Sequence, residues 1–378
     1  MSDKELHCCE NCRHFNRSSG FCNLRKEKIV SGNGTTCDSR NMFFHDVPKG
    51  VMKAVTHKVK DGERICREIP YYHGIRPDII QSETGEELRV SVIRDDGRKM
   101  DFPSVEDYIN YYKKQFDLPV ILTGALAGDI IGSVYEFNNI RTTDFPLFTN
   151  LSTYTDDTVM TLAVANKILR NSTYTVEMQR LGRRYPGTSY GSRFREWLFS
   201  EDPRPYFSYG NGSAMRVSPV AYAFENIEDV ISEAGMCAEV THNHPEGIKG
   251  ARAVASAVFL ARKGSSKKEI KDFIINRFNY DLNRKTDDIR KVYQFDESCQ
   301  GSVPEAIICF LESSDFENAI RLAVSIGGDS DTIASVTGAI AEAFYKDIGS
   351  EIKRRVLEYL PDDLLSILLE FSGVYKNN

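Results

Sequence analysis

The 378-residue chain lacks the features that define several protein classes. No run of apolar residues reaches the roughly 18 that a membrane-spanning helix needs, and the first residues are polar and cysteine-rich, unlike a secretory signal. Glycine and proline are modest, at 26 and 13 residues, and the hydrophobic fraction of 41% is ordinary. These values exclude collagen-like and disordered architectures and indicate a globular protein of two or three domains. We expect a cytoplasmic location and no membrane partner.

The chain has no excess of positive charge. The formal net charge is −6, and residues 118–378 contain 28 basic against 35 acidic side chains. A protein that binds nucleic acid needs clustered cations to neutralise the phosphates. The composition therefore argues against nucleic acid as the main partner, and it leaves the oligomeric state open.

The nine cysteines are an odd number, and five of them lie within the first 37 residues. In a chain with no export signal, such thiols indicate metal ligands or core residues before disulfides. The Cys-x2-Cys spacing followed by two further thiols is typical of a closed, four-ligand structural zinc site, although an iron–sulfur cluster or a set of incidental reduced thiols would also use cysteine. The predicted zinc ligands are Cys9, Cys12, Cys22 and Cys37, with His7, Cys8 and His14 as competitors.

Three parts follow from these patterns: a four-cysteine zinc module at 1–45, a short α/β segment at 46–116, and an all-α domain at 117–378. In the middle part, the alternation at 87–94 and 99–102 predicts a β-hairpin, and a capping box at 104–107 predicts the start of a helix. The last part shows helical periodicity almost throughout. Its predicted helices include 157–170, 248–262, 315–326, 331–344, 351–360 and 362–371, with capping boxes at Ser266 and Ser302 opening two more. The fold class is mainly α.

Two acidic segments open apolar helices. The first is Thr155-Asp156-Asp157, and the second runs from Asp329 through Asp331 to Thr332. A single aspartate or threonine would be an ordinary N-cap. Four carboxylates and two threonines exceed what capping requires, and such like charges beside apolar helices destabilise one another unless a cation binds. An all-oxygen ligand set favours magnesium, manganese or calcium, and two clusters could hold two ions.

A glycine stripe precedes these segments. Gly124, Gly128 and Gly132 recur every four residues, so we expect a bare helix face that another backbone approaches closely. Asp129 and Glu136 are seven residues apart and are expected on one side of the same helix.

Two weaker patterns concern a ligand. Residues 208–216 are small and suited to cradling a phosphate with exposed backbone amides, although such a run is more often just a loop. His242 and His244, two residues apart, could ligate a metal, or they could belong to a polar cap before the helix at 248–262.

Five segments in order resemble the ADP-ribosylglycohydrolases, typified by the dinitrogenase reductase-activating glycohydrolase. They are Gly-Asp-x-x-Gly with Tyr-Glu, Tyr-Thr-Asp-Asp-Thr-x-Met-Thr, Gly-Asn-Gly-Ser-Ala-Met-Arg, Thr-His-x-His and Gly-Gly-Asp-x-Asp-Thr, between about residues 120 and 345. The resemblance implies an all-α orthogonal bundle that binds two magnesium or manganese ions and hydrolyses the bond between ADP-ribose and an acceptor. It implies Thr155, Asp156, Asp157, Asp329, Asp331 and Thr332 as metal ligands, with Glu136, Asp156 and Asp157 as catalytic residues and Ser208, Tyr209, Gly210, Asn211, Gly212 and His242 as substrate contacts.

The resemblance predicts a hydrolase that removes ADP-ribose from modified arginine or serine side chains or from related small ADP-ribosyl compounds. Some family members carry a further acid, for which Glu196, Glu201 and Asp202 are the candidates. Two alternatives from other classes are a non-catalytic ADP-ribose-binding or structural protein and a two-metal phosphoester hydrolase. Residues 1–116 lie outside the resemblance.

Overall fold

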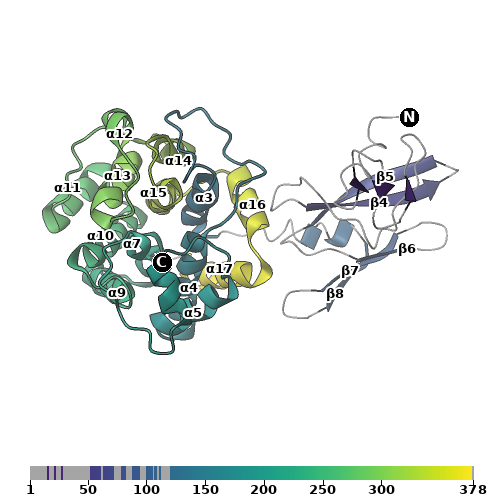
Figure 1. The fold of residues 1–378 in the computed structure, drawn as a ribbon, viewed down its shortest axis with the longest axis horizontal. Coiled ribbons are helices and arrows are strands. Elements are labelled where there is room, and N and C mark those ends of the chain that lie inside the picture. The colour runs from purple at the N-terminus through teal and green to yellow at the C-terminus, as the bar shows by residue number, and fades with distance from the viewer. Residues whose placement is uncertain are drawn as a thin grey trace. The chain divides into compact units, whose positions relative to one another are not determined.

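The computed structural model describes the strands within residues 15–93 as backbone, the side chains of 90–92, and residues 99–104, 106–108, 110–111 and 120–376 in full. The chain divides into two compact units, Met1–Gln115 and Phe116–Asn378 (Figure 1). Of the predicted zinc ligands, Cys9, Cys12 and Cys37 lie outside the described residues, and Cys22 is described only as backbone in a strand.

The first unit contains short antiparallel sheets. Strands β1, β2 and β3 form one sheet, β4 and β5 a second, and β6, β7 and β8 a third. The predicted hairpin is confirmed, since β7 pairs with β8 in a register that places Val90 opposite Phe102. The strands span Phe15–Asn16, Phe21–Cys22, Glu27–Lys28, Met52–Lys60, Glu63–Tyr71, Asp78–Gln81, Glu87–Ile93 and Lys99–Phe102 in order.

The second unit is helical, as the sequence predicts. Among the described residues, no helix is both long and apolar enough to cross a membrane. The helices are α3 Thr123–Gly132, α4 Asp156–Arg170, α5 Tyr174–Arg184, α6 Ser192–Phe199, α7 Gly212–Met215, α8 Ser218–Ala223, α9 Ile227–Glu239, α10 Pro245–Arg262, α11 Lys267–Phe278, α12 Thr286–Val292, α13 Cys299–Glu312, α14 Phe316–Ser325, α15 Ser330–Tyr345, α16 Ser350–Tyr359 and α17 Asp362–Tyr375.

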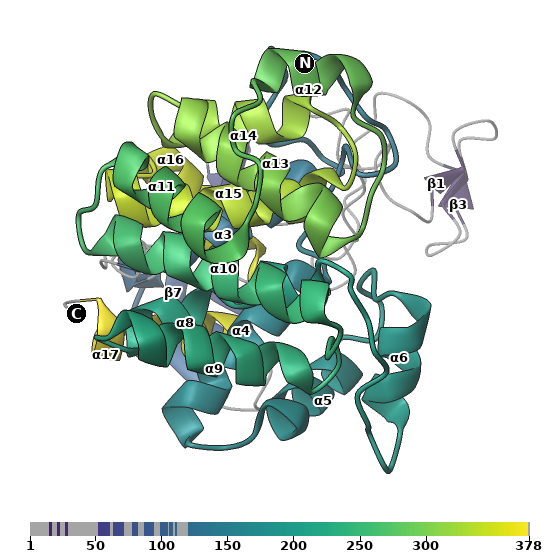
Figure 2. The ribbon, with the colours of Figure 1, turned by 90° about the vertical axis from the view of Figure 1, so that its left-hand side faces the viewer.

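Helices α3 and α15 form the centre of this unit, with the other helices arranged around them (Figure 2). Every residue of α3 is buried. A Cβ atom added at Gly124 would lie 2.4 Å from the backbone oxygen of Gly338, and one added at Gly128 would lie 2.0 Å from that of Ala334. Contacts this short leave no room for a side chain, so the predicted close approach of two backbones is confirmed.

Helix starts follow the capping residues, with one exception. Ser266 and Glu269 form the predicted capping box of α11. The predicted start at Ser302 is wrong, because the N-cap of α13 is Ser298, whose side chain accepts from the amide of Gly301. Ser302 lies one turn inside the helix and donates to the carbonyl of Ser298 at 2.8 Å. A serine four residues upstream thus competes successfully for the capping role and leaves Pro304 within the helix.

Candidate active site

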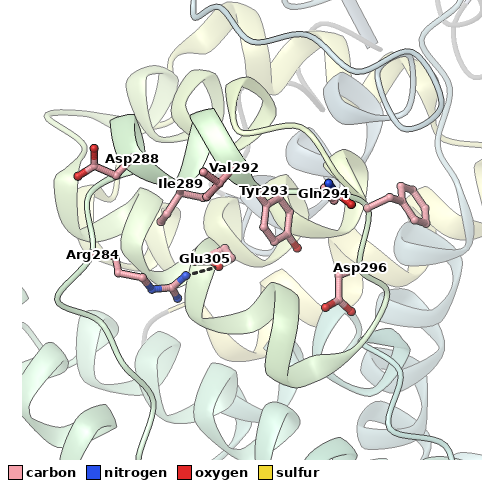
Figure 3. Close-up of a pocket in the computed structure, with 9 residues that line it drawn as sticks. Arg284, Asp288, Ile289, Val292, Tyr293, Gln294, Asp296 and Glu305 are labelled. Carbon is pink, nitrogen blue, oxygen red and sulfur yellow. Dashed lines mark hydrogen bonds and ion pairs between the residues drawn. The ribbon is translucent and has the colours of Figure 1, made fainter.

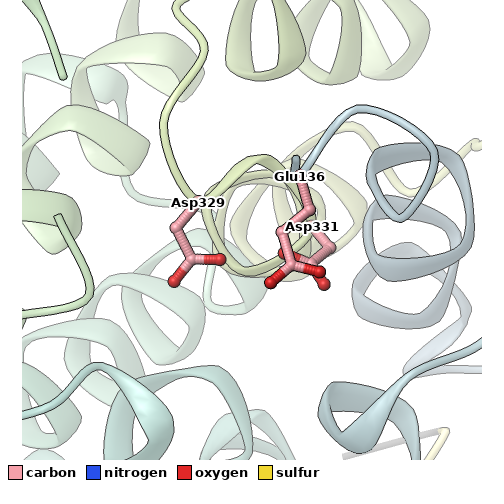
Figure 4. A group of neighbouring side chains, drawn as sticks. All are labelled: Glu136, Asp329 and Asp331. Atoms are coloured by element: carbon pink, nitrogen blue, oxygen red, sulfur yellow. The ribbon is translucent and has the colours of Figure 1, made fainter. Parts of the chain in front are cut away.

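The predicted acids converge from three segments of the helical unit. Glu136 lies in the turn after α3, while Asp329 and Asp331 come from the start of α15 (Figure 4). One oxygen from each of these three carboxylates lies within 4.8 Å of the others, a spacing that suits a shared cation. The start of α4 joins them, since Thr332 Oγ1 donates to Asp157 Oδ2 at 3.2 Å.

The start of α4 is held from behind by one buried acid. Asp129, fully buried on α3, accepts from the Thr155 amide at 2.9 Å, from Thr155 Oγ1 at 2.8 Å and from the Thr158 amide at 3.0 Å. Thr155 in turn is the N-cap of α4, and its side chain accepts from the amide of Asp157. Burial raises the pKa of Asp129 to about 6 although these donors lower it. Asp129 therefore supports the α4 acids without facing the cavity.

The start of α15 is held by glycines and amide side chains. Gly327 and Gly328 have φ angles of +70° and +78°, which fold the chain tightly before the helix. Asn139 brackets Gly328, since its Nδ2 donates to the Gly328 carbonyl at 2.9 Å and its Oδ1 accepts from the Gly328 amide at 2.8 Å. Asn211 Nδ2 donates to Asp329 Oδ2 at 2.7 Å.

Glu136 does not share a helix face with Asp129, so that prediction is wrong. Helix α3 ends at Gly132, because the Ser133 amide makes the last helical bond, to the Asp129 carbonyl, and the Tyr135 amide donates instead to the Gly132 carbonyl at 2.8 Å in a tight turn. Asp129 consequently points to the buried side of α4, whereas Glu136 lines the cavity.

The carboxylates raise one another's pKa. Burial, followed by the charges of Asp129 and Asp156, raises the pKa of Asp157 well above its usual value. Burial and then the charge of Asp329 raise the pKa of Glu136 to about 8. Asp157 Oδ1 is buried and has no hydrogen-bond partner among the residues that the structure describes. An unpartnered buried oxygen within an all-oxygen cluster is the arrangement that a divalent cation satisfies, so these residues fit the implied metal centre.

A cavity of about 280 Å³ opens over this cluster. Every site residue predicted in the helical unit lines it except Thr155, which is buried behind Asp157, and Tyr209, which is exposed with its ring centroid 5.4 Å from that of His244. Glu196, Glu201 and Asp202 do not line the cavity. The sequence reasoning assigned no role to several lining residues. Met215 and Arg216 end the Gly-Asn-Gly-Ser-Ala-Met-Arg segment, whereas the others follow no motif noted above and reach the cavity through the fold: Ser189, Gly191, Ser192, Arg193, Phe194, Tyr206 and Glu297.

The loop at 208–212 is partly closed to a phosphate. The Asn211 amide donates to the Glu297 carbonyl at 2.7 Å, and the Gly210 amide donates to Ser208 Oγ at 3.1 Å. The expectation of exposed amides is therefore wrong at these two positions, because the Asn211 amide attaches the loop to the segment before α13 and the Gly210 amide closes a turn within the loop.

The two histidines before α10 have separate positions. His244 is the N-cap of α10 and accepts from the amide of Glu246 at 3.1 Å, as the polar-cap interpretation predicts. His242 is 5% exposed and lines the cavity, and burial lowers the pKa of its ring well below the usual value. Among the described residues, neither belongs to a group that could hold a metal ion.

A second cavity, of about 460 Å³, lies beside α12 and the start of α13 (Figure 3). Its buried acid, Glu305, pairs with Arg284 at 2.6 Å. The remaining lining is mixed and contains none of the predicted site residues. The larger cavity therefore lacks the clustered, unpaired carboxylates that distinguish the smaller one.

Comparison with known proteins agrees with this geometry. The family model for ADP-ribosylglycohydrolase matches residues 121–376. The chain therefore belongs to the ADP-ribosylglycohydrolase family and is an enzyme that hydrolyses glycosidic bonds. The resemblance in sequence and the expected all-α fold of this domain are both confirmed.

Relatives differ in the names they carry. ADP-ribosylhydrolase ARH3 of Mus musculus is 29% identical over 304 residues, which cover 59% of this chain and 82% of that protein. ADP-ribosylarginine hydrolase Tri1 of Pseudomonas putida is 26% identical over 265 residues, covering 59% of this chain and 69% of that protein. A solved structure described as an ADP-ribosylglycohydrolase-related protein complex aligns with a TM-score of 0.54 at 25% identity, covering 70% of this chain and 99% of that one.

Proposed function

We propose that this enzyme hydrolyses the bond between ADP-ribose and a modified arginine or serine side chain, or a small ADP-ribosyl compound, at the cavity over the acid cluster. The observation that carries the proposal is the meeting of carboxylates from the turn after α3 and from the starts of α4 and α15. The relatives named above act on ADP-ribosyl substrates by name, which supports the substrate class.

Two magnesium or manganese ions would bind between the two helix starts. The proposed ligands are Thr155, Asp156, Asp157, Asp329, Asp331 and Thr332, and the unpartnered Asp157 Oδ1 supports this assignment. When bound, such ions orient ribose hydroxyls and stabilise negative charge. The protein's own part is to hold the carboxylates together in a buried site, for which Asp129, Asn139 and Asn211 supply the supporting hydrogen bonds.

Glu136 is the proposed proton carrier. As water forms its bond to C1 of the ribose, the bond from C1 to the acceptor breaks, a water proton passes to the Glu136 carboxylate, and Glu136 then gives this proton to the departing acceptor atom. Glu136 belongs to neither helix start, is half-buried at the cavity wall and has an oxygen within 4.8 Å of the Asp329 and Asp331 carboxylates, which supports this role. The loop at 208–212 and His242 would hold the diphosphate and ribose.

The test is an assay with three substrates: an arginine-ADP-ribosylated peptide, a serine-ADP-ribosylated peptide and ADP-ribose 1''-phosphate. We expect release of ADP-ribose from at least one of them in the presence of magnesium or manganese and none after treatment with EDTA. Full activity in EDTA would overturn the two-metal proposal. A simple phosphoester, p-nitrophenyl phosphate, is added as a control substrate, and hydrolysis confined to it would favour the two-metal phosphoesterase.

Glu136→Gln tests the proton role. The amide keeps the size and one hydrogen bond but accepts no proton, so turnover should be lost while ADP-ribose binding is retained. Glu239→Gln, on the exposed side of α9, is the matched control. Normal turnover by Glu136→Gln would assign Glu136 a structural role, and joint loss of binding and turnover would make it a positioning residue.

For the N-terminal cysteines we propose a structural zinc bound by Cys9, Cys12, Cys22 and Cys37. The Cys-x2-Cys spacing supports it, and a closed site of this kind leaves no position for catalytic water. We expect about one zinc per purified chain, lost in Cys22→Ser. Absence of zinc would contradict the proposal, and iron–sulfur absorption would replace it.

A further inference from the structure

Arg216 is a fully buried guanidinium at the cavity wall. Among the described residues no carboxylate lies within ion-pair distance of it, so its charge is balanced at most from afar by the acid cluster. Its two hydrogen bonds show what it orients: it donates to the Cys237 carbonyl at 3.0 Å and to Thr241 Oγ1 at 2.8 Å. Burying a charge without a direct partner costs stability. We therefore expect the bonds from Arg216 to the Cys237 carbonyl and to Thr241 Oγ1 to have a function.

Thr241 connects Arg216 to the histidine of the cavity. Thr241 Oγ1 lies 2.7 Å from His242 Nδ1. A guanidinium has only donors, so the Thr241 oxygen must accept from Arg216. The hydroxyl proton of Thr241 then needs an acceptor, and in the part of the chain that the structure describes His242 Nδ1 is its one remaining partner. A hydroxyl that donates to Nδ1 leaves Nδ1 without a proton and places the ring proton on Nε2, whereas the opposite tautomer would leave the Thr241 hydroxyl proton without an acceptor among the described residues.

The other ring nitrogen faces the cavity loop. A Cβ atom on Gly212 would lie 3.2 Å from His242 Nε2, and one on Gly210 would lie 3.5 Å from it. Because both residues are glycines, the nitrogen is not covered by side chains, and the described residues offer it no hydrogen-bond partner. A ring that is 5% exposed thus directs one unpartnered nitrogen toward the space where a substrate binds.

The two tautomers of His242 would have opposite effects on a ligand. With the proton on Nε2, the neutral ring donates to an oxygen atom in the cavity. With the proton on Nδ1, the ring presents a lone pair that repels an anionic oxygen. The burial that keeps the ring neutral also means that protonation does not supply the missing donor at moderate pH.

We propose that Arg216 is a positioning residue that acts through the Thr241 hydroxyl to hold His242 as its Nε2–H tautomer, so that the ring donates a hydrogen bond to an anionic oxygen of the substrate. The identity of that oxygen, a diphosphate oxygen of an ADP-ribosyl compound, rests on the proposed function. The tautomer does not, and it can be measured without turnover.

The first measurement is a long-range ¹⁵N–¹H correlation spectrum of the full chain labelled at histidine. The chain has seven histidines, so His242→Gln identifies the signals of His242. We expect a protonated Nε2 and a bare Nδ1 in the wild-type protein. A protonated Nδ1 would overturn the proposal, whatever the activity of the enzyme.

The second measurement uses Thr241→Val, which keeps the shape of the side chain and removes the hydroxyl. We expect the spectrum to show a mixture of tautomers and KM for an ADP-ribosylated peptide to rise about tenfold, the equivalent of one ordinary hydrogen bond, with kcat nearly unchanged. Thr241→Ser should restore both. The matched control is Thr337→Val, which removes a buried threonine hydroxyl bonded to the Ala306 carbonyl at 2.9 Å, far from the histidine in sequence and outside the cavity lining.

A double-mutant cycle separates the relay from general destabilisation. His242→Gln places an amide donor close to the Nε2 position and does not depend on a tautomer. Adding Thr241→Val to His242→Gln should therefore cause no further rise in KM, so the two changes should be strongly non-additive. Additive effects, or a wild-type tautomer ratio in Thr241→Val, would overturn the relay. A correct tautomer in a protein that hydrolyses none of the ADP-ribosyl substrates would instead overturn the proposed function.

Discussion

The starts of α4 and α15 supply similar acids but are supported in different ways. At α4, one buried carboxylate, that of Asp129, accepts three hydrogen bonds and adds its own negative charge to the cluster. At α15, the neutral Asn139 amide donates to and accepts from the backbone of Gly328, one of two glycines with positive φ, and the neutral Asn211 amide donates to Asp329. The acids at the start of α4 therefore depend more on a bound cation for their stability, whereas the conformation at the start of α15 is fixed mainly by its backbone.

The largest effect should come from removing one carboxylate at each helix start. Asp157→Asn and Asp329→Asn should each lower kcat/KM about a thousandfold or more, because each takes away a charged ligand while keeping its shape. The helix content measured by circular dichroism should stay the same. Asp272→Asn, an exposed aspartate on α11, is the control. Activity within tenfold of wild type in either variant would contradict the assignment of that helix start.

The support of α4 can be broken without touching a proposed ligand. In Asp129→Asn, one acceptor oxygen becomes an amide donor facing the Thr155 and Thr158 amides. We expect magnesium affinity, measured by isothermal titration calorimetry, to fall about 10- to 100-fold, as is typical when a partner of a metal ligand is lost. Unchanged affinity would show that Thr155 holds the start of α4 unaided.

The support of α15 is best tested through its backbone. Gly328→Ala should destabilise the protein by about 2 to 4 kcal/mol, because an L-residue is strained at positive φ and because the new methyl group meets the Tyr293 ring, 2.4 Å from Cε1. Gly349→Ala is the matched control, since its φ is +81° and nothing lies within 4 Å of its Cβ position. The control should lose about 1 to 2 kcal/mol, from the backbone strain alone. Equal losses in urea unfolding would show that the contact with Tyr293 is unimportant.

The smallest effect concerns a buried acid outside the cluster. Burial raises the pKa of Glu342 to about 7, although Thr123 and the Gly124 amide donate to it. The protonated form is therefore favoured on folding, and its contribution to stability is present below pH 4.5 and lost as the pH rises through 7. In Glu342→Gln, which does not titrate, the stability relative to wild type should improve by about 1 to 2 kcal/mol between about pH 4.5 and pH 6. A constant difference in urea unfolding would contradict the raised pKa.

Much of this architecture could be predicted from local patterns. The spacing of Gly124, Gly128 and Gly132 predicts a bare helix face because only a backbone contact requires glycine at every fourth position, and α15 makes that contact. The doubled acids likewise predict that two helix starts share a function, because capping alone does not need them.

Other features depend on contacts distant in sequence. The sequence offers no sign that α3 ends before Glu136, since the turn there depends on how the start of α15 meets Gly132. The bond from Asn211 to Asp329 spans 118 positions, and no local pattern signals it. Ser298 and Ser302 are equally suitable N-caps by sequence. Ser298 becomes the N-cap of α13 because the chain before the helix is bonded to Tyr209 and Asn211.

The backbone contact between α3 and α15 also makes the site stiff. Side chains in an interface can change rotamer and let two helices slide, whereas carbonyls and glycines packed directly on each other have no such freedom. The added Cβ at Gly132 would fall 2.5 Å from the Asp331 Cα, so the contact continues to the acids themselves. Backbone packing thus fixes the distance between the turn that carries Glu136 and the helix that carries Asp331. A larger residue at Gly124, Gly128 or Gly132 would push the two helices apart. We therefore expect new substrate specificity to evolve through the loops at the cavity rim and not through this helix contact.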